Sequence, residues 1–188
     1  MASIRQAPSS IAPNLDNYRP WFDTYLAKLP EADAKLLQNA LSLAEAHYPA
    51  AALTSNGEPL LSNLLGAAEM VADMDLLPDA VAATLLTDIS GYCPDWQQKV
   101  TEACNADIAS LVKGIDEVQK LTHFAKVDSL ATPEERAEQA ETMRKMLLAM
   151  VSDIRVVLIK LADRTHNMRT LSDMPRSKWG RISSETLE

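Results

Sequence analysis

The sequence is poor in glycine, cysteine and long apolar runs, and each scarcity excludes a class of protein. Only five of the 188 residues are glycine and strand-type alternation is almost missing, which disfavours a β-rich fold. Cys93 and Cys104 do not form a Cys-x-x-Cys pair, so we expect reduced structural thiols. No stretch reaches the roughly 18 apolar residues of a membrane span, and the N-terminus lacks a signal-peptide core. We therefore expect a cytoplasmic protein with no membrane partner.

Basic residues are also in deficit. The chain has 18 lysines and arginines against 26 aspartates and glutamates, which gives a formal net charge of −8. Phosphate backbones repel an acidic surface, so we expect no direct nucleic-acid binding by this domain. The hydrophobic content of 47% is that of a folded globular protein.

Helix patterns fill most of the chain. Apolar residues recur at helical spacing, and several segments begin at a proline, which is favoured in the first turn of a helix. The length suits one domain with a sizeable core. We therefore predict an all-α bundle of about eight to ten helices. The expected helices cover residues 19–29, 30–48, 60–74, 78–89, 96–104, 107–121, 136–152, 154–171 and a last one from 175.

The two ends of the chain carry separate expectations. Residues 1–18 contain prolines and serines and are predicted to form a flexible leader before a single domain at 19–188. The helical pattern that starts at Pro175 is still running at Glu188. We therefore expect that the natural protein continues and that this chain is a piece of it.

The segment "LIKLADRTHNMRTL" (158–171) combines an apolar helical face with a dense polar block. Asp163 stands at the edge of that face, where a carboxylate must be paired, hydrogen-bonded or bound to a metal, because stranding it costs several kcal/mol. The predicted buried face consists of Leu158, Ile159, Leu161, Ala162, Met168 and Leu171.

The longer stretch "MLLAMVSDIRVVLIKLADRTHNMRTL" (146–171) resembles the signature of the HD-type hydrolase domain of the RelA/SpoT family, which makes and hydrolyses (p)ppGpp. Two other segments are more loosely similar to family motifs. "SNGEPLLSNLLGAA" (55–68) is similar to Ser-Gly-Glu-Pro-Tyr-x-x-His-Pro, and "TLLTDISGY" (84–92) falls at Leu-Leu-His-Asp-x-x-Glu-Asp. The resemblance implies an HD-like helical fold.

The resemblance also implies a chemistry. In the family, two histidines and two aspartates hold a metal, usually manganese, which lowers the pKa of a bound water for attack on the 3′-pyrophosphate. A Glu-Asp pair just after the His-Asp motif positions that water.

Residue by residue, this pattern is only partly kept. Asn63 and Thr87 replace the two histidines, and Gly91 and Tyr92 replace the Glu-Asp pair, whereas Asp88 and Asp163 are retained. The remaining histidines, His47, His123 and His166, fall on no ligand position. We therefore predict no bound metal, no cofactor and no catalytic residue. His166 is interpreted as a packed, hydrogen-bonded histidine.

Three polar residues match the surroundings of the family's nucleotide pocket. Lys120, Arg164 and Asn167 are predicted as a remnant of guanine-nucleotide binding. The methionines of "MRKMLLAM" (143–150) are interpreted as core residues, and the connector at 125–139 as a solvated loop.

The pattern of loss resembles the RelA kind of long RelA/SpoT protein, which keeps the hydrolase fold without its active site. The expected function is therefore a structural and regulatory domain of a GTP pyrophosphokinase (ATP:GTP 3′-diphosphotransferase) of the stringent response. The expected partners are the synthetase domain in cis and, through other regions of the full-length protein, the ribosome.

Two alternatives are open at this point. The first is an active metal-dependent (p)ppGpp 3′-pyrophosphohydrolase that uses Asp88, Asp163 and an unconventional ligand such as His166. The second is a guanine-nucleotide-sensing module that binds through Asn167 and Lys120 without chemistry.

Overall fold

The computed structural model describes residues 15–54, 57–125, 141, 144 and 153–170. Within them lie seven α-helices and one 3-10 helix, and the only β-type pairing is an isolated bridge between Leu53 and Pro59, which confirms the predicted all-α class. None of these helices is long and apolar enough to cross a membrane. The elements are α1 (Leu15–Leu26), α2 (Glu31–His47), α3 (Leu60–Asp73), α4 (Pro78–Leu85), η1 (Ile89–Gly91), α5 (Trp96–Ala103), α6 (Ala106–Ala125) and α8 (Ile154–Thr170).

The helix count falls one short of the predicted range because two expected helices are not among these elements. The segments at 136–152 and from Pro175 onward lie outside the described residues, apart from Glu141 and Arg144. The expected connector and most of the leader also lie outside them. The count of seven therefore applies to the described part of the chain only.

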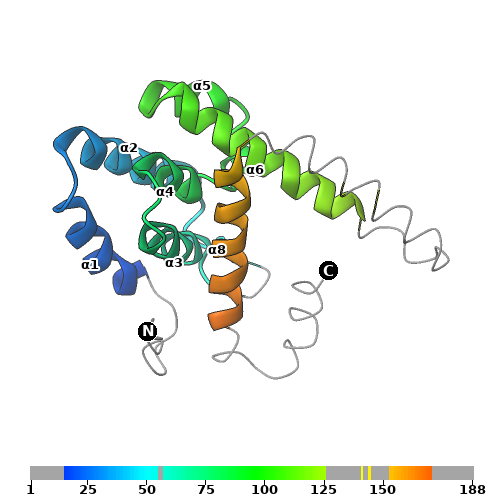
Figure 1. Cartoon of the computed structure of the whole chain (residues 1–188), viewed down its shortest axis with the longest axis horizontal. Helices are drawn as coiled ribbons and strands as arrows, with labels where there is room; N and C mark the ends of the chain where they lie inside the picture. The colour runs from blue at the N-terminus through cyan, green and yellow to red at the C-terminus, as the bar shows by residue number, and fades with distance from the viewer. Residues whose placement is uncertain (1–14, 55–56, 126–140, 142–143, 145–152, 171–188) are drawn as a thin grey trace.

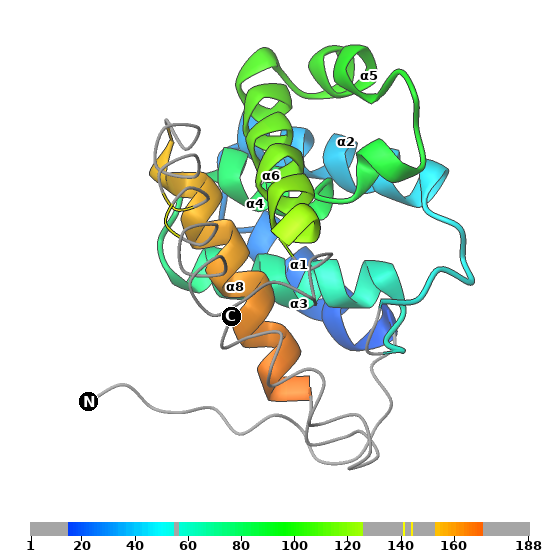
Figure 2. The ribbon, with the colours of Figure 1, turned by 90° about the vertical axis from the view of Figure 1, so that its right-hand side faces the viewer.

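The helices pack around a central pair, α3 and α4. α3 and α4 lie side by side, with α1 and α2 packed on one side of them and α8 on the other (Figure 1). α6 crosses above α4, contacts the first part of α8 and carries α5 on its outer side, as the turned view in Figure 2 also shows. α8 therefore closes the bundle by lying along α3.

The core is centred on α3 and α4 because these helices are buried on most sides. Every residue of α4 from Ala80 to Leu85 is buried. Its alanines have no long side chains, so α2, α3 and α6 can all approach it closely. α3 buries ten of its 14 residues, including two polar ones, Ser62 and Asn63. Most buried polar side chains have a hydrogen-bond partner, and Asn63 has one on α8.

Three helices depart from their predicted bounds by three or four residues. α1 runs from Leu15 to Leu26 and not over 19–29, and α6 runs on to Ala125, four residues past its predicted end at 121 and into the first residue of the expected connector. α4 ends at Leu85 and not at Ile89, so the predicted helix is wrong over its last four residues. The reason is local: the Thr87 hydroxyl donates to the carbonyls of Ala83 and Thr84, 3.4 and 2.9 Å away, and competes with the helical backbone. The chain tightens there and enters the 3-10 turn η1.

The buried face of α8 agrees with the predicted one at Ile159 and Ala162 only. Leu161 and Met168 were expected inside, but their exposed fractions are 55% and 40%, and Leu158 is only half-buried. Leu171 lies outside the described residues. The apolar residues of α8 were predicted to lie on one face of the helix, whereas they are divided between two faces. The face that packs on the bundle consists of Val156, Ile159, Ala162 and His166.

Both cysteines are free thiols. Cys93 is buried and Cys104 is half-buried, and no disulfide joins them. Burial raises the pKa of the Cys104 thiol to about 11, so little reactive thiolate is present at neutral pH.

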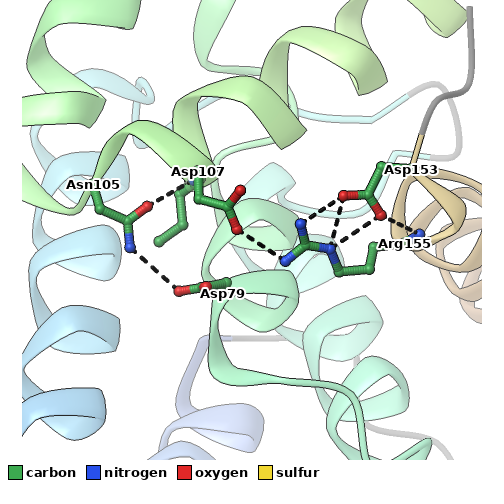
Figure 3. A network of polar contacts seen from close by, with 6 residues as sticks. Asp79, Asn105, Asp107, Asp153 and Arg155 are labelled. Atoms are coloured by element: carbon green, nitrogen blue, oxygen red, sulfur yellow. Dashed lines mark hydrogen bonds and ion pairs between the residues drawn. The ribbon is translucent and has the colours of Figure 1, made fainter.

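Polar contacts tie the start of α8 to the start of α6 (Figure 3). The Asp153 carboxylate caps α8 by accepting from the Arg155 backbone N–H at 2.9 Å, and it also holds the Arg155 guanidinium at 2.6 Å. Arg155 reaches Asp107 of α6 at 3.0 Å. Asn105 caps α6 through the Ile108 N–H and donates to a carboxylate in the first turn of α4, that of Asp79 at 3.4 Å. The position of α8 is therefore set at its first turn.

This arrangement makes Arg155→Met costly at neutral pH. The variant should lose about 1–2 kcal/mol of unfolding free energy, because charge-assisted hydrogen bonds between helices disappear. Arg19→Met, which removes only an exposed ion pair to Glu45, should lose at most about 0.5 kcal/mol. Urea unfolding of both variants measures the difference, and equal losses would contradict it.

The loss should also depend on pH. The Arg155 side chain lowers the pKa of the Asp153 carboxyl. The stabilisation from this pair is therefore complete above the carboxyl pKa of the unfolded chain, and it is lost as the pH falls through the lower carboxyl pKa of the folded protein. The gap between wild type and Arg155→Met should therefore be smaller at pH 3 than at pH 7.

Candidate functional site

Three segments far apart in the sequence meet where α8 lies on α3. The first turn of α3 carries Asn63, the turn after α4 carries Thr87 and Asp88, and α8 carries Asp163. Asn63 and Thr87 are each 3% exposed, and the two aspartates are half-buried. Asp163 and its neighbour Lys160 both influence the ionisation of Asp88 through space. The positions predicted from sequence therefore lie in one region of the fold.

The Asn63 side chain joins α3 to α8. Its amide group donates to the Asn167 side-chain oxygen at 2.7 Å and to the Glu58 carboxylate at 2.9 Å. The Asn167 amide in turn donates to the Asp163 carboxylate at 3.2 Å, which also accepts from Lys160 at 3.5 Å. Both amide hydrogens of Asn63 are thus directed at oxygen atoms. A hydrogen-bonded chain from Glu58 to Lys160 results.

Glu58 and His166 form a buried pair beneath Asn63. Glu58 is 1% exposed and His166 is 5% exposed, and the His166 Nε2 lies 3.3 Å from the Glu58 carboxylate. The edge of the Tyr18 ring in α1 packs against the imidazole, with the ring centroids 6.0 Å apart. His166 is therefore a packed and hydrogen-bonded residue, as its sequence interpretation proposed. Its Nε2 is directed at a carboxylate and is not part of a group of metal-binding side chains among the described residues.

Gly66 gives His166 its space. A methyl group at residue 66 would overlap the imidazole ring of His166, because that ring packs directly against the backbone of α3 there. A glycine inside a helix costs about 1 kcal/mol relative to alanine. The close approach of the His166 ring explains why the helix carries a glycine at this position.

Thr87 and Asp88 are held by their own surroundings. The Thr87 hydroxyl is directed back at backbone carbonyls of α4. Asp88 accepts from the Gln119 side chain of α6 at 3.2 Å. Burial raises the pKa of the Asp88 carboxyl, while the hydrogen bond from Gln119 and the charge of Lys160 oppose that increase.

Gly91 and Tyr92 lie on the solvent side of η1. Both are exposed, Tyr92 by 41%, and its ring packs edge-on against Tyr48 with centroids 5.4 Å apart. A glycine has no side chain with which to hold a water. A phenol is a poor general base at neutral pH. Neither residue supplies the carboxylate that orients a water in the family's reaction.

Several proteins of known family are similar in sequence to this chain. A family model described as an HD domain matches residues 40–188. The bifunctional (p)ppGpp synthase/hydrolase SpoT of Escherichia coli strain K12 is 40% identical over 161 residues, which cover 85% of this chain and 21% of that protein. A GTP pyrophosphokinase of Myxococcus xanthus is 35% identical over 188 residues, covering 100% of this chain and 22% of that protein. The GTP pyrophosphokinase rsh of Brucella ovis is 37% identical over 134 residues, or 71% of this chain and 17% of that protein.

The chain belongs to the RelA/SpoT family. The part of the family that it represents is the HD domain, which agrees with the predicted fold. The chain spans about a fifth of the length of these relatives. The name of the Escherichia coli relative gives both synthesis and hydrolysis of (p)ppGpp, and the other two names give a GTP pyrophosphokinase. Family membership alone therefore does not decide which chemistry this chain retains.

The side chains at the positions of the two expected histidines bond within the protein. Asn63 turns its amide hydrogens toward Asn167 and Glu58, and Thr87 turns its hydroxyl toward backbone carbonyls. Each could offer a metal only a neutral oxygen in place of an imidazole nitrogen. Among the described residues, no group of three or more His, Cys, Asp or Glu side chains is placed to hold a metal. The alternative ligand set of Asp88, Asp163 and His166 therefore does not come together in this conformation.

The predicted nucleotide-binding remnants are divided between two helices. Lys120 of α6 pairs with Asp116 at 2.6 Å, and Asp116 also accepts from Ser90 at 2.7 Å. Arg164 and Asn167 lie on α8, both half-buried, and Asn167 belongs to the hydrogen-bonded chain that starts at Glu58. The assignment of these three residues to nucleotide binding stays a prediction.

Two residues of the site were not singled out from the sequence. Glu58 and Gly66 lie in the segment that resembles the family's Ser-Gly-Glu-Pro motif, but no role was assigned to them. A glutamate two residues before α3 was a usable signal, because a carboxylate that is buried beside a largely apolar helix needs a partner. Glu58 is buried in the structure. The partner itself, His166, is 108 residues away and could not be identified from one sequence.

Gly66→Ala should destabilise the protein by about 1–3 kcal/mol, because the added methyl group displaces the His166 ring and strains the contact between α3 and α8. Gly91→Ala is the matched control, since nothing lies within 4 Å of the position of its added methyl group. That variant should stay within about 0.5 kcal/mol of wild type. Urea unfolding of the two variants provides the measurement, and a neutral Gly66→Ala would show that α8 does not sit against α3 in this way.

Proposed function

We propose that this chain is a catalytically inactive (p)ppGpp hydrolase-like domain that acts as a structural and regulatory unit for a synthetase region of the same polypeptide. The full-length protein would be a GTP pyrophosphokinase that works in the cytoplasm and meets the ribosome through other regions. The observation that carries the proposal is the direction of the Asn63 amide, whose two hydrogens are directed at Glu58 and Asn167.

The side chains at the four changed positions are poor substitutes for metal ligands and for a catalytic base. An amide and a hydroxyl replace the two imidazoles, so two strong ligands for a divalent ion are lost at once. Losing merely an outer partner of a ligand costs about 10–100-fold in metal affinity or activity, and losing two direct ligands should cost far more. Because Gly91 and Tyr92 provide no carboxylate, a captured ion would still lack the groups that orient water.

The regulatory part of the proposal rests on the integrity of the rest of the domain. The helices keep a continuous core, and α8 is held by a cap, an interhelical ion pair and the buried Glu58–His166 contact. A rigid unit of this kind biases a neighbouring catalytic region whenever it contacts two states of that region differently. The domain therefore has a physical means of acting without chemistry of its own.

The hydrolase activity is the first test. The wild-type chain with manganese and ppGpp should release no pyrophosphate above background, while an active relative such as the Escherichia coli SpoT protein does. Isothermal titration should detect no stoichiometric manganese binding to wild type. The double variant Asn63→His/Thr87→His should gain one manganese site, because it restores two imidazoles beside Asp88 and Asp163.

The hydrolase assay, the manganese titration and a titration with ppGpp together separate the alternatives. Manganese-dependent turnover by the wild-type chain would refute the proposal and make the domain an enzyme. Failure of the double variant to bind manganese would contradict the idea that only the ligands have changed. Saturable binding of ppGpp to wild type without turnover would instead favour a nucleotide-sensing module.

The regulatory role requires a separate test on the full-length protein. Removal of residues 1–180 should change the rate of (p)ppGpp synthesis or its response to ribosomes, since the contact that biases the synthetase region is lost. Steady-state synthesis assays with and without ribosomes measure this. An unchanged rate together with an unchanged response would defeat the regulatory role.

A further inference from the structure

The connection between α3 and α4 carries two exposed apolar side chains. Met74 and Leu77 have exposed fractions of 42% and 64%, whereas Leu76 between them packs against the core. Leu77 is the residue before the first turn of α4, and its side chain makes no capping hydrogen bond. A serine, threonine, asparagine or aspartate there would stabilise the helix by capping it. The leucine therefore neither caps α4 nor packs inside the domain.

Two exposed carboxylates flank these apolar side chains. Asp73 and Asp75 are exposed, and no lysine or arginine of the described residues lies within ion-pair distance of either one. Asp75 has a left-handed backbone conformation, with a φ angle of 55°, which aspartate tolerates better than most residues. We call Asp73, Met74, Asp75 and Leu77 the acidic corner.

The acidic corner belongs to the part of the chain that carries its net charge. Residues 36–98 contain eight aspartates and glutamates and no lysine or arginine, which matches the formal net charge of −8 for the whole chain. Six of these eight carboxylates have partners inside the domain, and they are Glu45, Glu58, Glu69, Asp79, Asp88 and Asp95. The charges of Asp73 and Asp75 are therefore the ones left for a partner from outside the domain.

The acidic corner lies near aromatic side chains of α1. Burial raises the pKa of the Tyr25 hydroxyl, and the negative charges of Asp33 in α2 and of Asp75 add to this increase. The half-buried rings of Tyr25 and Trp21 stack, with their centroids 5.5 Å apart and 11° between their planes. Figure 1 shows the connection between α3 and α4 on the side of the bundle where α1 lies. This side thus combines negative charge with apolar and aromatic surface.

The sign of the charge and the size of the surface define the partner. Two adjacent carboxylates repel an anionic membrane or a nucleic acid and attract lysine and arginine side chains. An apolar centre with a polar rim is the usual anatomy of a protein interface. Two exposed apolar side chains offer far less than the roughly 1,200–2,000 Å² that a stable contact between large proteins buries. A short segment that binds weakly and reversibly fits this surface.

The segment that directly follows α8 starts far from the acidic corner. Asn167, in the last turn of α8, lies 2.7 Å from Asn63 in the first turn of α3. The corner begins at the last residue of α3, and a helix of 14 residues is about 21 Å long. The chain therefore leaves α8 at the opposite end of α3 from the corner. A segment of another protein reaches the corner without crossing the bundle.

We propose that the acidic corner is a docking site for a short basic amphipathic segment of another protein. Lysine or arginine side chains of that segment pair with Asp73 and Asp75, and its apolar side chains cover Met74 and Leu77. The acidic corner and the candidate site occupy opposite ends of α3. The docking site is therefore independent of whether the domain hydrolyses (p)ppGpp.

Titration of the 188-residue chain with fluorescent synthetic peptides tests this binding. The probe is a 12-residue peptide made of three repeats of Leu-Lys-Lys-Leu, and fluorescence anisotropy measures its affinity. It should bind saturably at 50 mM salt and at least about tenfold more weakly at 500 mM salt, because salt screens exposed charges. Three repeats of Leu-Glu-Glu-Leu and three of Ser-Lys-Lys-Ser should each bind at least about tenfold more weakly than the probe, since one lacks the charge and the other the apolar anchors.

Variants of the chain locate the binding site. Leu77→Ser and the double variant Asp73→Asn/Asp75→Asn should each weaken binding of the probe about tenfold. Asparagine tolerates the left-handed conformation at residue 75, so the double variant keeps the shape of the connection. Leu53→Ser is the matched control, because Leu53 is 61% exposed but precedes α3. It should leave the affinity unchanged, and circular dichroism checks that all variants keep their helical content.

Several results would overturn the docking site. These are a wild-type chain that does not bind the probe at 50 mM salt, undiminished binding by Leu77→Ser or by the double asparagine variant, and equal binding of the Ser-Lys-Lys-Ser peptide. Sedimentation velocity adds a further check. Self-association that disappears in Leu77→Ser would assign the acidic corner to a second copy of the chain and would also overturn the proposal.

Discussion

The amide of Asn63 is the contact on which the rest of the site depends. It is buried in a helix most of whose residues are buried, so its hydrogen-bond partners are other protein groups. It is satisfied by Asn167 of α8 and by Glu58, and Glu58 in turn takes up His166. Because an unsatisfied polar group buried in such a place costs about 1–3 kcal/mol, these partners are held together as one unit. The packing of α8 on α3 therefore depends on the hydrogen bonds of Asn63 and its partners.

Hydrogen bonds hold separate segments together around the candidate site. The amides of Asn63 and Asn167 join α3 to α8, and the buried Glu58–His166 pair joins α8 to the segment before α3. Gly66 leaves room for the His166 ring, and the Arg155 contacts fix the other end of α8. The helix is held at both ends by side chains of the protein.

Much of the fold and part of the site could be predicted from the sequence, and the misses have identifiable causes. Helical periodicity and prolines located the helices, and the quoted motifs located Asn63, Thr87, Asp88 and Asp163. The end of α4 was missed because the Thr87 hydroxyl competes with the backbone, an effect weaker than the apolar pattern that runs through it. Leu161 was placed in the core because periodicity reports apolar residues on a helix but not which of two faces is covered.

The sequence by itself determined the all-α class and the family, and its motifs led to the prediction that two imidazoles and two carboxylates of the family pattern are replaced, because these depend on residue types at positions along the chain. Only the tertiary structure decided that Asn63 donates to Asn167, 104 residues away, and that Glu58 meets His166 against Gly66. It also decided which side of α8 packs on the other described helices. Contacts between distant segments depend on how whole helices pack against each other. The pattern of residues within one helix does not show which residue of another helix it will contact.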